Sequence, residues 1–242
     1  MTSIGIYGNN GRMGRAIATI ATSEGVAIAG GADAGSDPFP IAHAADVLVD
    51  FSTPAALESH LAAAIAARTP IVIGTTGLLA THQALLEQAA DVIPVLQTGN
   101  TSLGVTLLEM LVREAAARLG PDWDIEIAEM HHRHKVDAPS GTALLLGDAA
   151  AAGRATRLAE VRVDSRAGLV GARSEGTIGF ASLRGGSVVG DHMVVFAGEG
   201  ERIEIAHRAE DRTIFARGAV KAALWLAGRA PGRYAMAEVL GL

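Results

Sequence analysis

The chain has 242 residues, carries a formal charge of −6 at pH 7 and contains no cysteine. The lack of cysteine excludes disulfides, thiolate metal sites and cysteine nucleophiles, and the negative charge disfavours general nucleic-acid binding. Five Phe, two Trp and two Tyr are too few for a surface that stacks bases or sugars. The sequence has no long apolar run and no basic leader, so we expect a cytoplasmic protein with no membrane or nucleic-acid partner.

The first hundred residues alternate short apolar runs with alanine-rich stretches. This alternation predicts right-handed strand–helix–strand units and a parallel sheet, as in Rossmann-like α/β domains. The β-branched runs argue against an all-helical chain, which the abundance of alanine would otherwise suggest. Strands are expected at residues 3–7, 26–31, 47–51, 70–74 and 92–96, and helices at residues 12–22, 54–67 and 81–90.

The pattern changes near residue 102, where a second unit of the α+β class begins. A long helix is expected at residues 103–119, a strand at 124–128 and a helix at 140–151. Glycine-rich turns then separate three strands, at residues 177–183, 187–197 and 202–207, and predict antiparallel hairpins in a mixed or antiparallel open sheet. A last helix at residues 213–227 closes the chain.

A glycine-rich loop, Gly-Asn-Asn-Gly-Arg-Met-Gly, follows the first strand. Gly8 permits a tight turn, Gly11 lets backbone N–H groups approach phosphate, and Gly14 allows close helix packing. Asn10 stands where the usual dinucleotide fingerprint has its middle glycine, and Asn tolerates positive φ well. The position of the loop between a strand and a helix start predicts a pyrophosphate site.

An acidic residue at the end of the second strand supports this interpretation. Asp33 lies 19 residues after Gly14, where a carboxylate can bind the adenosine ribose, although a turn or cap aspartate is the alternative. Ala34 follows, with no arginine beside it for a 2′-phosphate, which favours NADH over NADPH. Arg12 could hold a phosphate and keeps NADPH open.

Two further loops follow strand ends, Gly-Thr-Thr-Gly at residues 74–77 and Thr-Gly-Asn-Thr at residues 98–101. The carboxyl ends of parallel strands line the ligand crevice of such sheets, so the hydroxyl and amide groups there suit a nicotinamide nucleotide. Either loop alone is equally compatible with ordinary turn chemistry.

The most distinctive segment spans residues 129–143, Glu-Met-His-His-Arg-His-Lys-Val-Asp-Ala-Pro-Ser-Gly-Thr-Ala. Its cationic cluster precedes a predicted helix start, with Ser140 as N-cap and the N–H groups of Gly141 and Thr142 forming an anion site. Histidine can carry a proton near neutral pH, and Lys135 can donate one. We therefore expect a site for a small molecule with more than one carboxylate.

Other interpretations of this segment are a zinc site, at His131 and His134 or at His132 and His134, and a solvated basic loop without function. At the level of the whole chain, three alternatives stand beside a nicotinamide-dependent enzyme that acts on such a dicarboxylate. They are another Rossmann-fold dehydrogenase acting on an amino or imino dicarboxylate, a non-catalytic dinucleotide sensor, and a metal-dependent hydrolase.

The motif at residues 129–143, together with residues 8–14 and the Val-Ile-Gly-Thr-Thr-Gly run at 72–77, closely resembles the dihydrodipicolinate reductases (4-hydroxy-tetrahydrodipicolinate reductases) of bacterial lysine and diaminopimelate biosynthesis. Residues 176–181, 189–192 and 218–226 agree as well, so the resemblance covers almost the whole chain. It implies an enzyme that reduces a cyclic imine dicarboxylate with NADH or NADPH and no metal. It also implies a homotetramer assembled through the sheet of the second domain.

The resemblance also implies domain limits and residue roles. The dinucleotide-binding domain would span residues 1–102, completed by residues 212–242, and the substrate-binding and tetramerisation domain would span residues 103–211. His131 would be the proton donor or acceptor, and Lys135 would be the second proton donor. Substrate would be bound by His132, Ser140, Gly141 and Thr142, and the dinucleotide by Gly8, Asn9, Asn10, Gly11, Arg12, Met13, Asp33, Gly74, Thr75, Thr76, Thr98, Gly99, Asn100 and Thr101.

Two features depart from the family pattern. The stretch between Asp33 and the third strand is short, so a surface excursion common in the family is missing. The Thr-Gly-Asn-Thr loop replaces the more usual Ala-Ala-Asn-Phe, so an aromatic contact of that loop is absent.

Overall fold

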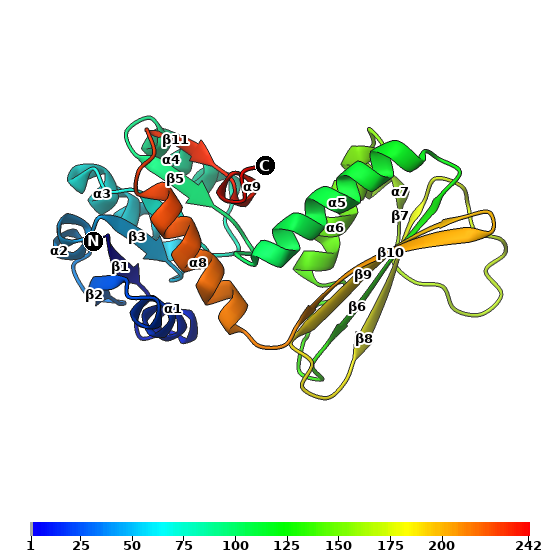
Figure 1. The fold of residues 1–242 in the computed structure, drawn as a ribbon, viewed down its shortest axis with the longest axis horizontal. Helices are drawn as coiled ribbons and strands as arrows, with labels where there is room; N and C mark the ends of the chain where they lie inside the picture. The colour runs from blue at the N-terminus through cyan, green and yellow to red at the C-terminus, as the bar shows by residue number, and fades with distance from the viewer. Residues whose placement is uncertain (1) are drawn as a thin grey trace. The chain divides into compact units, whose positions relative to one another are not determined.

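The computed structural model describes residues 2–242, which divide into two compact units. The first unit combines residues 2–103 with residues 213–242, and the second is the continuous segment 104–212. Each unit has a sheet and a hydrophobic core of its own, visible in Figure 1 as two separate sets of strands.

The first unit is built on a six-stranded parallel sheet in the order β11-β5-β4-β3-β1-β2. The order reverses between β1 and β3, which is the switch point where open α/β sheets bind ligands. The strands are β1 (Ser3–Tyr7), β2 (Ala27–Ala32), β3 (Val47–Asp50), β4 (Ile71–Ile73), β5 (Pro94–Gln97) and β11 (Gly232–Tyr234).

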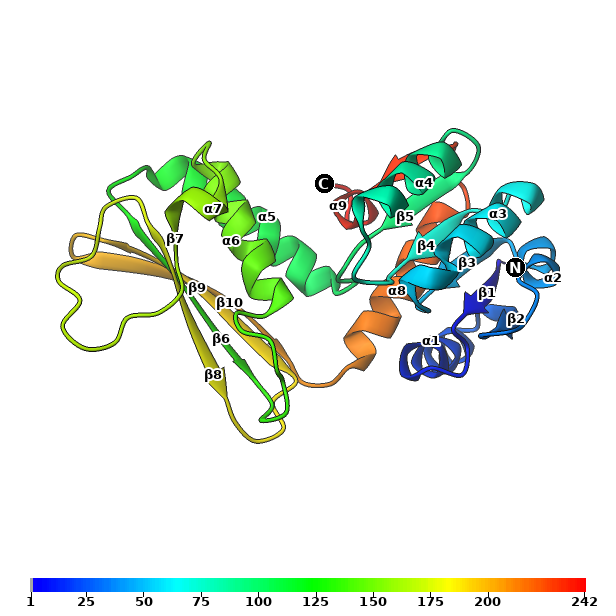
Figure 2. The same ribbon diagram turned by 180° about the vertical axis from the view of Figure 1, so that it is seen from behind.

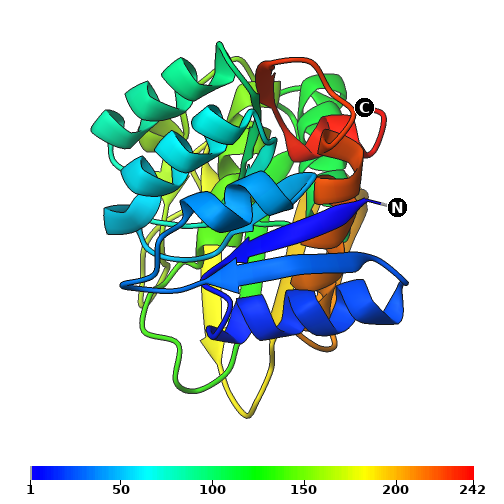
Figure 3. The same ribbon diagram turned by 90° about the vertical axis from the view of Figure 1, so that its left-hand side faces the viewer.

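Helices cover both faces of this sheet (Figure 3), and a separate apolar cluster fills each interface. One face carries α1 (Arg12–Ser23), α8 (Thr213–Leu226) and α9 (Met236–Val239). The other carries α2 (Phe39–Ala44), the 3-10 turn η1 (Pro54–Ala56) that leads into α3 (Leu57–Ala67), and α4 (Ala80–Ala90). Helix α8 therefore belongs to the core of the first unit, although it follows the second unit in the sequence.

The second unit has a mixed five-stranded sheet in the order β10-β9-β6-β8-β7. Its elements are α5 (Leu103–Leu119), β6 (Asp124–His131), α6 (Gly141–Gly153), α7 (Leu158–Val161), β7 (Arg162–Val163), β8 (Ile178–Arg184), β9 (Gly190–Gly198) and β10 (Glu201–Ala209). The helices α5 and α6 pack on one face of the sheet, as Figure 2 shows, and alternate strand residues such as Ile125 and Ile127 fill the interface.

The predicted hairpin between residues 177–183 and 187–197 is wrong. β6 lies between β8 and β9, pairing parallel with β8 and antiparallel with β9. The glycine turn after β8 passes the end of β6, where the N–H of Gly185 donates to the carbonyl of His131 and the N–H of Arg133 donates to the carbonyl of Gly186. The turn therefore crosses over β6 to connect β8 with β9, and the local sequence does not reveal that crossing.

Strand β6 also continues three residues beyond the predicted limit at residue 128. Its residues alternate strictly in exposure, and the odd positions up to His131 are buried. Glu129 and His131 thus belong to a rigid strand and face the helix layer rather than lying in a loop.

Candidate active site

The predicted dinucleotide residues all follow β1, β2, β4 or β5, or begin α1, and so gather at the carboxyl edge of the parallel sheet. Gly8 has φ +80°, which side chains with a Cβ rarely adopt, and its N–H donates to the carbonyl of Ala32. A Cβ at Gly14 would collide with the carbonyl oxygen of Gly8 and lie 2.7 Å from Cα of Asn9. The first turn of α1 therefore packs directly on the loop, and the tight cradle fits a dinucleotide pyrophosphate.

In the loops after β4 and β5, only some of the predicted dinucleotide-binding residues are exposed at the edge of the sheet. Thr75 is buried, and its hydroxyl lies 3.3 Å from a carboxylate oxygen of Asp50. Thr101 is buried too, and its hydroxyl donates to the carbonyl of Phe215 in α8 at 2.7 Å. Gly74, Thr76, Thr98, Gly99 and Asn100 retain at least partial exposure. Thr75 and Thr101 thus shape their loops from inside, with their side chains turned away from the edge.

A polar cluster at the end of β3 was not predicted from the sequence. The fully buried carboxylate of Asp50 accepts hydrogen bonds from the N–H and hydroxyl of Ser52 at 2.9 and 2.6 Å and lies 2.8 Å from Nδ1 of His60. The His60 ring stacks on Tyr7 with centroids 4.0 Å apart. Although an acid, a histidine and a serine meet here, the serine hydroxyl serves the acid, so the cluster is a loop anchor and not a nucleophilic triad.

In the second unit, the histidine- and lysine-rich segment at residues 129–143 is organised around Glu129. Its carboxylate lies 2.6 Å from Nδ1 of His131 and accepts two hydrogen bonds from Arg184, each at 2.8 Å. The backbone N–H of Ser140 donates to the same carboxylate at 3.2 Å. Burial alone would raise the pKa of Glu129, but hydrogen bonds from Arg184, His131 and Ser182 outweigh it and lower the pKa to about 2.

Ser140 caps helix α6 as predicted, because its hydroxyl accepts from the N–H of Ala143 at 3.2 Å. The same hydroxyl lies 3.0 Å from Nε2 of His192, whose ring meets that of His131 edge-on with centroids 5.1 Å apart. Burial, and secondarily the charge of His131, lowers the pKa of His192 to about 4. His192 is therefore neutral at pH 7 beside the start of the helix that carries Gly141 and Thr142.

The remaining predicted residues lie on the turn after β6. The ammonium group of Lys135 donates to both carboxylate oxygens of Asp137, at 2.8 and 2.9 Å, which lowers the pKa of Asp137. Nε2 of His132 lies 3.4 Å from a guanidinium nitrogen of Arg212. Desolvation and the positive charge of Arg212 lower the pKa of His132.

Two findings bear on metals and membranes. Across residues 2–242, no three or more His, Asp or Glu side chains group in a way that could hold a metal ion. Within the same described range, no helix combines the length and apolar character needed to cross a membrane.

Sequence reasoning missed Glu129, Arg184 and His192 as members of the site, although Glu129 and His192 fall within motifs quoted above. Register brings them together, since Glu129 pairs with Ser182 on one side and with His192 on the other. The first unit carries a glycine loop at the switch point of a parallel sheet, and the second carries a buried histidine, a lysine and a capped helix start. This set of features is typical of a nicotinamide-dinucleotide-dependent oxidoreductase.

Comparison with known proteins gives the family. Residues 2–101 match the family model described as "Dihydrodipicolinate reductase, N-terminus", and residues 104–240 match "Dihydrodipicolinate reductase, C-terminus". A relative from Zymomonas mobilis, named 4-hydroxy-tetrahydrodipicolinate reductase, is 58% identical and covers 99% of this chain and 97% of its own. One of the same name from Parvibaculum lavamentivorans is 50% identical, covering 98% and 97%. The chain belongs to the dihydrodipicolinate reductase family.

Solved structures agree on the fold. A dipicolinate-bound dihydrodipicolinate reductase from Paenisporosarcina sp. TG-14 superimposes with a TM-score of 0.75 at 21% identity, covering 97% of both chains. A probable dehydrogenase from Thermotoga maritima has a TM-score of 0.64 at 11% identity and covers 98% of this chain and 92% of its own. The predicted fold class, a Rossmann-like domain with a second mixed-sheet domain, is confirmed.

Proposed function

We propose that this protein reduces 4-hydroxy-tetrahydrodipicolinate to tetrahydrodipicolinate in diaminopimelate and lysine biosynthesis. One substrate molecule, one NAD(P)H and one proton give tetrahydrodipicolinate, NAD(P)+ and water. The observation that carries the proposal is the segment from Glu129 to Thr142, which joins a buried histidine, a lysine and a capped helix start. Relatives of 50 to 58% identity that bear this enzyme name support it.

The site residues divide the work as follows. When bound, the nicotinamide dinucleotide supplies the hydride. The partial positive charge at the start of α6, at Gly141 and Thr142, holds one substrate carboxylate, and His132 contacts the substrate beside it. Hydride addition leaves one negative charge on the conjugated imine, and one proton from His131 or Lys135 neutralises it. The other group donates a proton to the hydroxyl that leaves as water and regains one from the adjacent ring carbon, so that one proton is consumed overall, and each group contributes roughly 10²–10⁴-fold in rate.

We further propose that residues 1–102 and 212–242 form the dinucleotide-binding domain and that NADH is the slightly preferred cofactor. Pyrophosphate would lie on Gly8, Asn9, Asn10, Gly11, Arg12 and Met13, and the nicotinamide half beside Gly74, Thr76, Thr98, Gly99 and Asn100, with Thr75 and Thr101 supporting those loops from inside. The carboxylate of Asp33 would accept hydrogen bonds from ribose hydroxyls and would repel the 2′-phosphate of NADPH.

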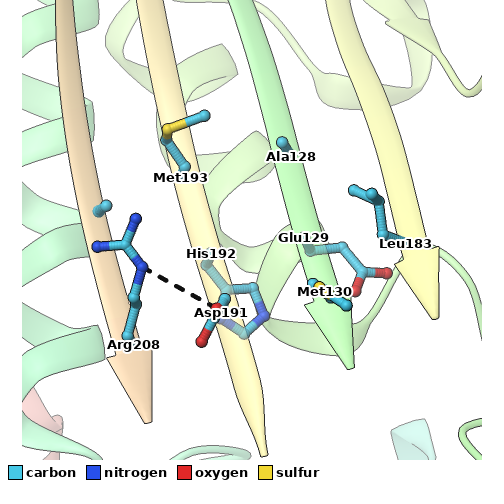
Figure 4. A pocket seen from close by; sticks show the side chains of 9 residues that line it. Ala128, Glu129, Met130, Leu183, Asp191, His192, Met193 and Arg208 are labelled. Atoms are coloured by element: carbon cyan, nitrogen blue, oxygen red, sulfur yellow. Dashed lines mark ion pairs between the residues drawn. The ribbon is translucent and has the colours of Figure 1, made fainter. Parts of the chain in front are cut away.

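Residues 103–211 would bind substrate and assemble four chains in the cytoplasm, where the reduced dinucleotide is available. The sheet face opposite α5 and α6 presents Ala128, Met130, Leu183 and Met193 around a hollow of about 140 Å3 (Figure 4), and Leu183 is 52% exposed. At the rim, Arg208 and Asp191 form an ion pair at 4.0 Å. An apolar face with a charged rim is typical of a surface between subunits.

The test is a coupled assay with freshly generated substrate, run with NADH and NADPH side by side. We expect oxidation of either cofactor that depends on substrate, with NADH modestly favoured, and near-complete loss of turnover in His131→Asn. Absence of oxidation with both cofactors would refute the proposed reaction.

A further inference from the structure

The carboxylate of Glu129 takes part in four hydrogen bonds within the segment at residues 129–143 and its neighbours, yet its role does not follow from the proposed chemistry. Its side chain is 1% exposed, and both oxygens are engaged. Oε2 receives His131 and one nitrogen of Arg184, and Oε1 receives the other nitrogen of Arg184 and the N–H of Ser140. The acceptor positions of the carboxylate are therefore taken by donors from three residues, His131, Arg184 and Ser140.

The bond to His131 determines which ring nitrogen carries a proton in the neutral imidazole. An ionised carboxylate only accepts hydrogen bonds, so the Nδ1 atom facing it must bear hydrogen. Nε2 is then the atom that takes up and releases the exchangeable proton. That atom lies beside Gly190, where a Cβ would stand 2.9 Å from it, so the small residue leaves room around Nε2.

The bonds from Arg184 extend the arrangement beyond one histidine. Arg184 also donates to the backbone carbonyl of Asp137 at 2.7 Å, and Asp137 holds the ammonium group of Lys135. Through Arg184 and Ser140, the Glu129 carboxylate is thus connected to the turn that carries Lys135 and to the first residue of the α6 anion site. A charge this deeply buried is retained only when each hydrogen bond compensates its desolvation.

We propose that Glu129 is the positioning residue of this site. It fixes His131 as the Nδ1-protonated tautomer, so that Nε2 is the proton-transferring atom, and it holds the Lys135 turn and the α6 start in register through Arg184 and Ser140. This rests on the proposed function in that His131 is taken as a proton donor. The tautomer itself can be tested without reference to any reaction.

The first measurement uses the unmodified protein. Long-range ¹H–¹⁵N NMR of ¹⁵N-histidine-labelled protein distinguishes the two neutral tautomers, and the His131 signals are identified by their loss in His131→Asn. We expect the Nδ1–H form for His131. An Nε2–H form in the wild-type protein would overturn the proposal, whether or not any variant folds.

The second measurement compares Glu129→Gln with Glu126→Gln. Glu126 lies on the same strand and is also paired with two arginines, Arg166 and Arg173, but it faces the opposite side of the sheet. An amide at position 129 can either donate to or accept from Nδ1, so the tautomer is no longer fixed. We expect mixed His131 tautomers and a kcat at least about tenfold lower in Glu129→Gln, with the KM for NADH within about twofold of wild type and the His131 spectrum unchanged in Glu126→Gln.

Wild-type kcat and an unchanged tautomer in Glu129→Gln would contradict the proposal. A protein that shows the Nδ1–H tautomer but does not oxidise NADH or NADPH would refute the proposed reaction while supporting the placement of His131 by Glu129. The two failures are therefore distinguishable.

Discussion

The carboxylate of Asp33 accepts two hydrogen bonds from Asn10, one from its backbone N–H at 2.9 Å and one from its side-chain amide at 2.6 Å. Asn10 stands in the glycine loop at the position where the dinucleotide fingerprint usually has glycine, so the substitution couples the loop to the acid after β2. The carboxylate that would recognise the ribose is thereby held in place before any ligand binds.

Replacing Asp33 should change cofactor preference. Asp33→Ser removes the charge that repels a 2′-phosphate and one acceptor for the ribose hydroxyls, so the ratio of kcat/KM for NADH to that for NADPH should fall on the order of tenfold, or ~1.4 kcal/mol. Steady-state assays with both cofactors measure the ratio. Asp37→Ser, an exposed acid of the same loop, is the charge-matched control. An unchanged ratio in Asp33→Ser would contradict the role given to this carboxylate.

Gly14→Ala should weaken dinucleotide binding. The added Cβ meets backbone atoms of Gly8 and Asn9, which can move only if the phosphate cradle changes shape. We expect the Kd for NADH, measured by calorimetric titration, to rise at least about tenfold. Gly228→Ala adds a methyl group where no atom lies within 4 Å and should bind NADH like the wild type. Equal affinity in the two variants would show that the loop is not the cofactor cradle.

Lys135→Met should reduce kcat by roughly 10²–10⁴-fold, because the variant keeps the aliphatic stem but loses the proton donor. Calorimetry should show NADH binding unchanged, since Lys135 is not part of the first unit. The sequence has one other lysine, Lys221, which is exposed on α8, and Lys221→Met provides the control. Turnover of Lys135→Met equal to that of the control would remove the lysine from the mechanism.

His192 should make the folded state acid-sensitive. Its pKa is lowered from 6.5 to about 4 on folding, mainly by burial, so between these pH values the unfolded chain binds a proton that the folded chain refuses. The free energy of unfolding should therefore decrease as the pH falls from 6.5 to 4, by up to about 3 kcal/mol from this group. Urea unfolding at several pH values measures the slope.

His192→Asn should flatten the slope of the free energy of unfolding against pH between 6.5 and 4. The change in each protein is measured relative to its own value at pH 8. The lowered pKa of Glu129, about 2, acts in a separate window, because its contribution is complete above 4.5 and is lost only as the pH falls towards 2. An equal slope between pH 6.5 and 4 in wild type and His192→Asn would show that another group dominates acid sensitivity.

The open sheet face should determine assembly. Met193→Asp places a charge in the hollow on that face and should convert the proposed tetramer to smaller species in light-scattering measurements after size-exclusion chromatography. Val92→Asp introduces the same charge at a 39% exposed apolar position of the first unit and should leave the mass unchanged. A tetrameric Met193→Asp protein would place the subunit interface elsewhere.

Most of the fold could be predicted because its strands and helices carry strong local signals. The strand before Gly8 and the alanine-rich α8 are examples, whereas α2, β7 and β11 are short and depend on tertiary contacts. The insertion of β6 between β8 and β9 could not be predicted, because adjacent strands separated by a glycine turn favour a hairpin whenever nothing local indicates an intervening strand.

The site was predictable where its residues are consecutive. His131, Lys135 and the Ser140 cap fall in one segment, whereas Arg184 and His192 are 55 and 63 residues from Glu129 and meet it only through strand register. One signal was available, since alternation from Ile125 places Glu129 on the buried face, and a buried acid requires partners. Asp50 is a second acid of this kind, since it ends the apolar run of β3 and its burial likewise requires hydrogen-bond partners.

The path of the chain through the two units affects how the protein folds while the ribosome synthesises it. The second unit is one uninterrupted segment inserted into the first, and α8 contributes fully buried residues, among them Ala219 and Val220, to the core around β1 and β3. A ribosome delivers residues 104–212 before residues 213–242, so the second unit can mature first. Until translation is almost complete, the N-terminal part of the first unit lacks α8, so the sheet face over β3, β4 and β5 is uncovered beside α1. Early chaperone contacts on nascent chains should therefore map to β3, β4 and β5.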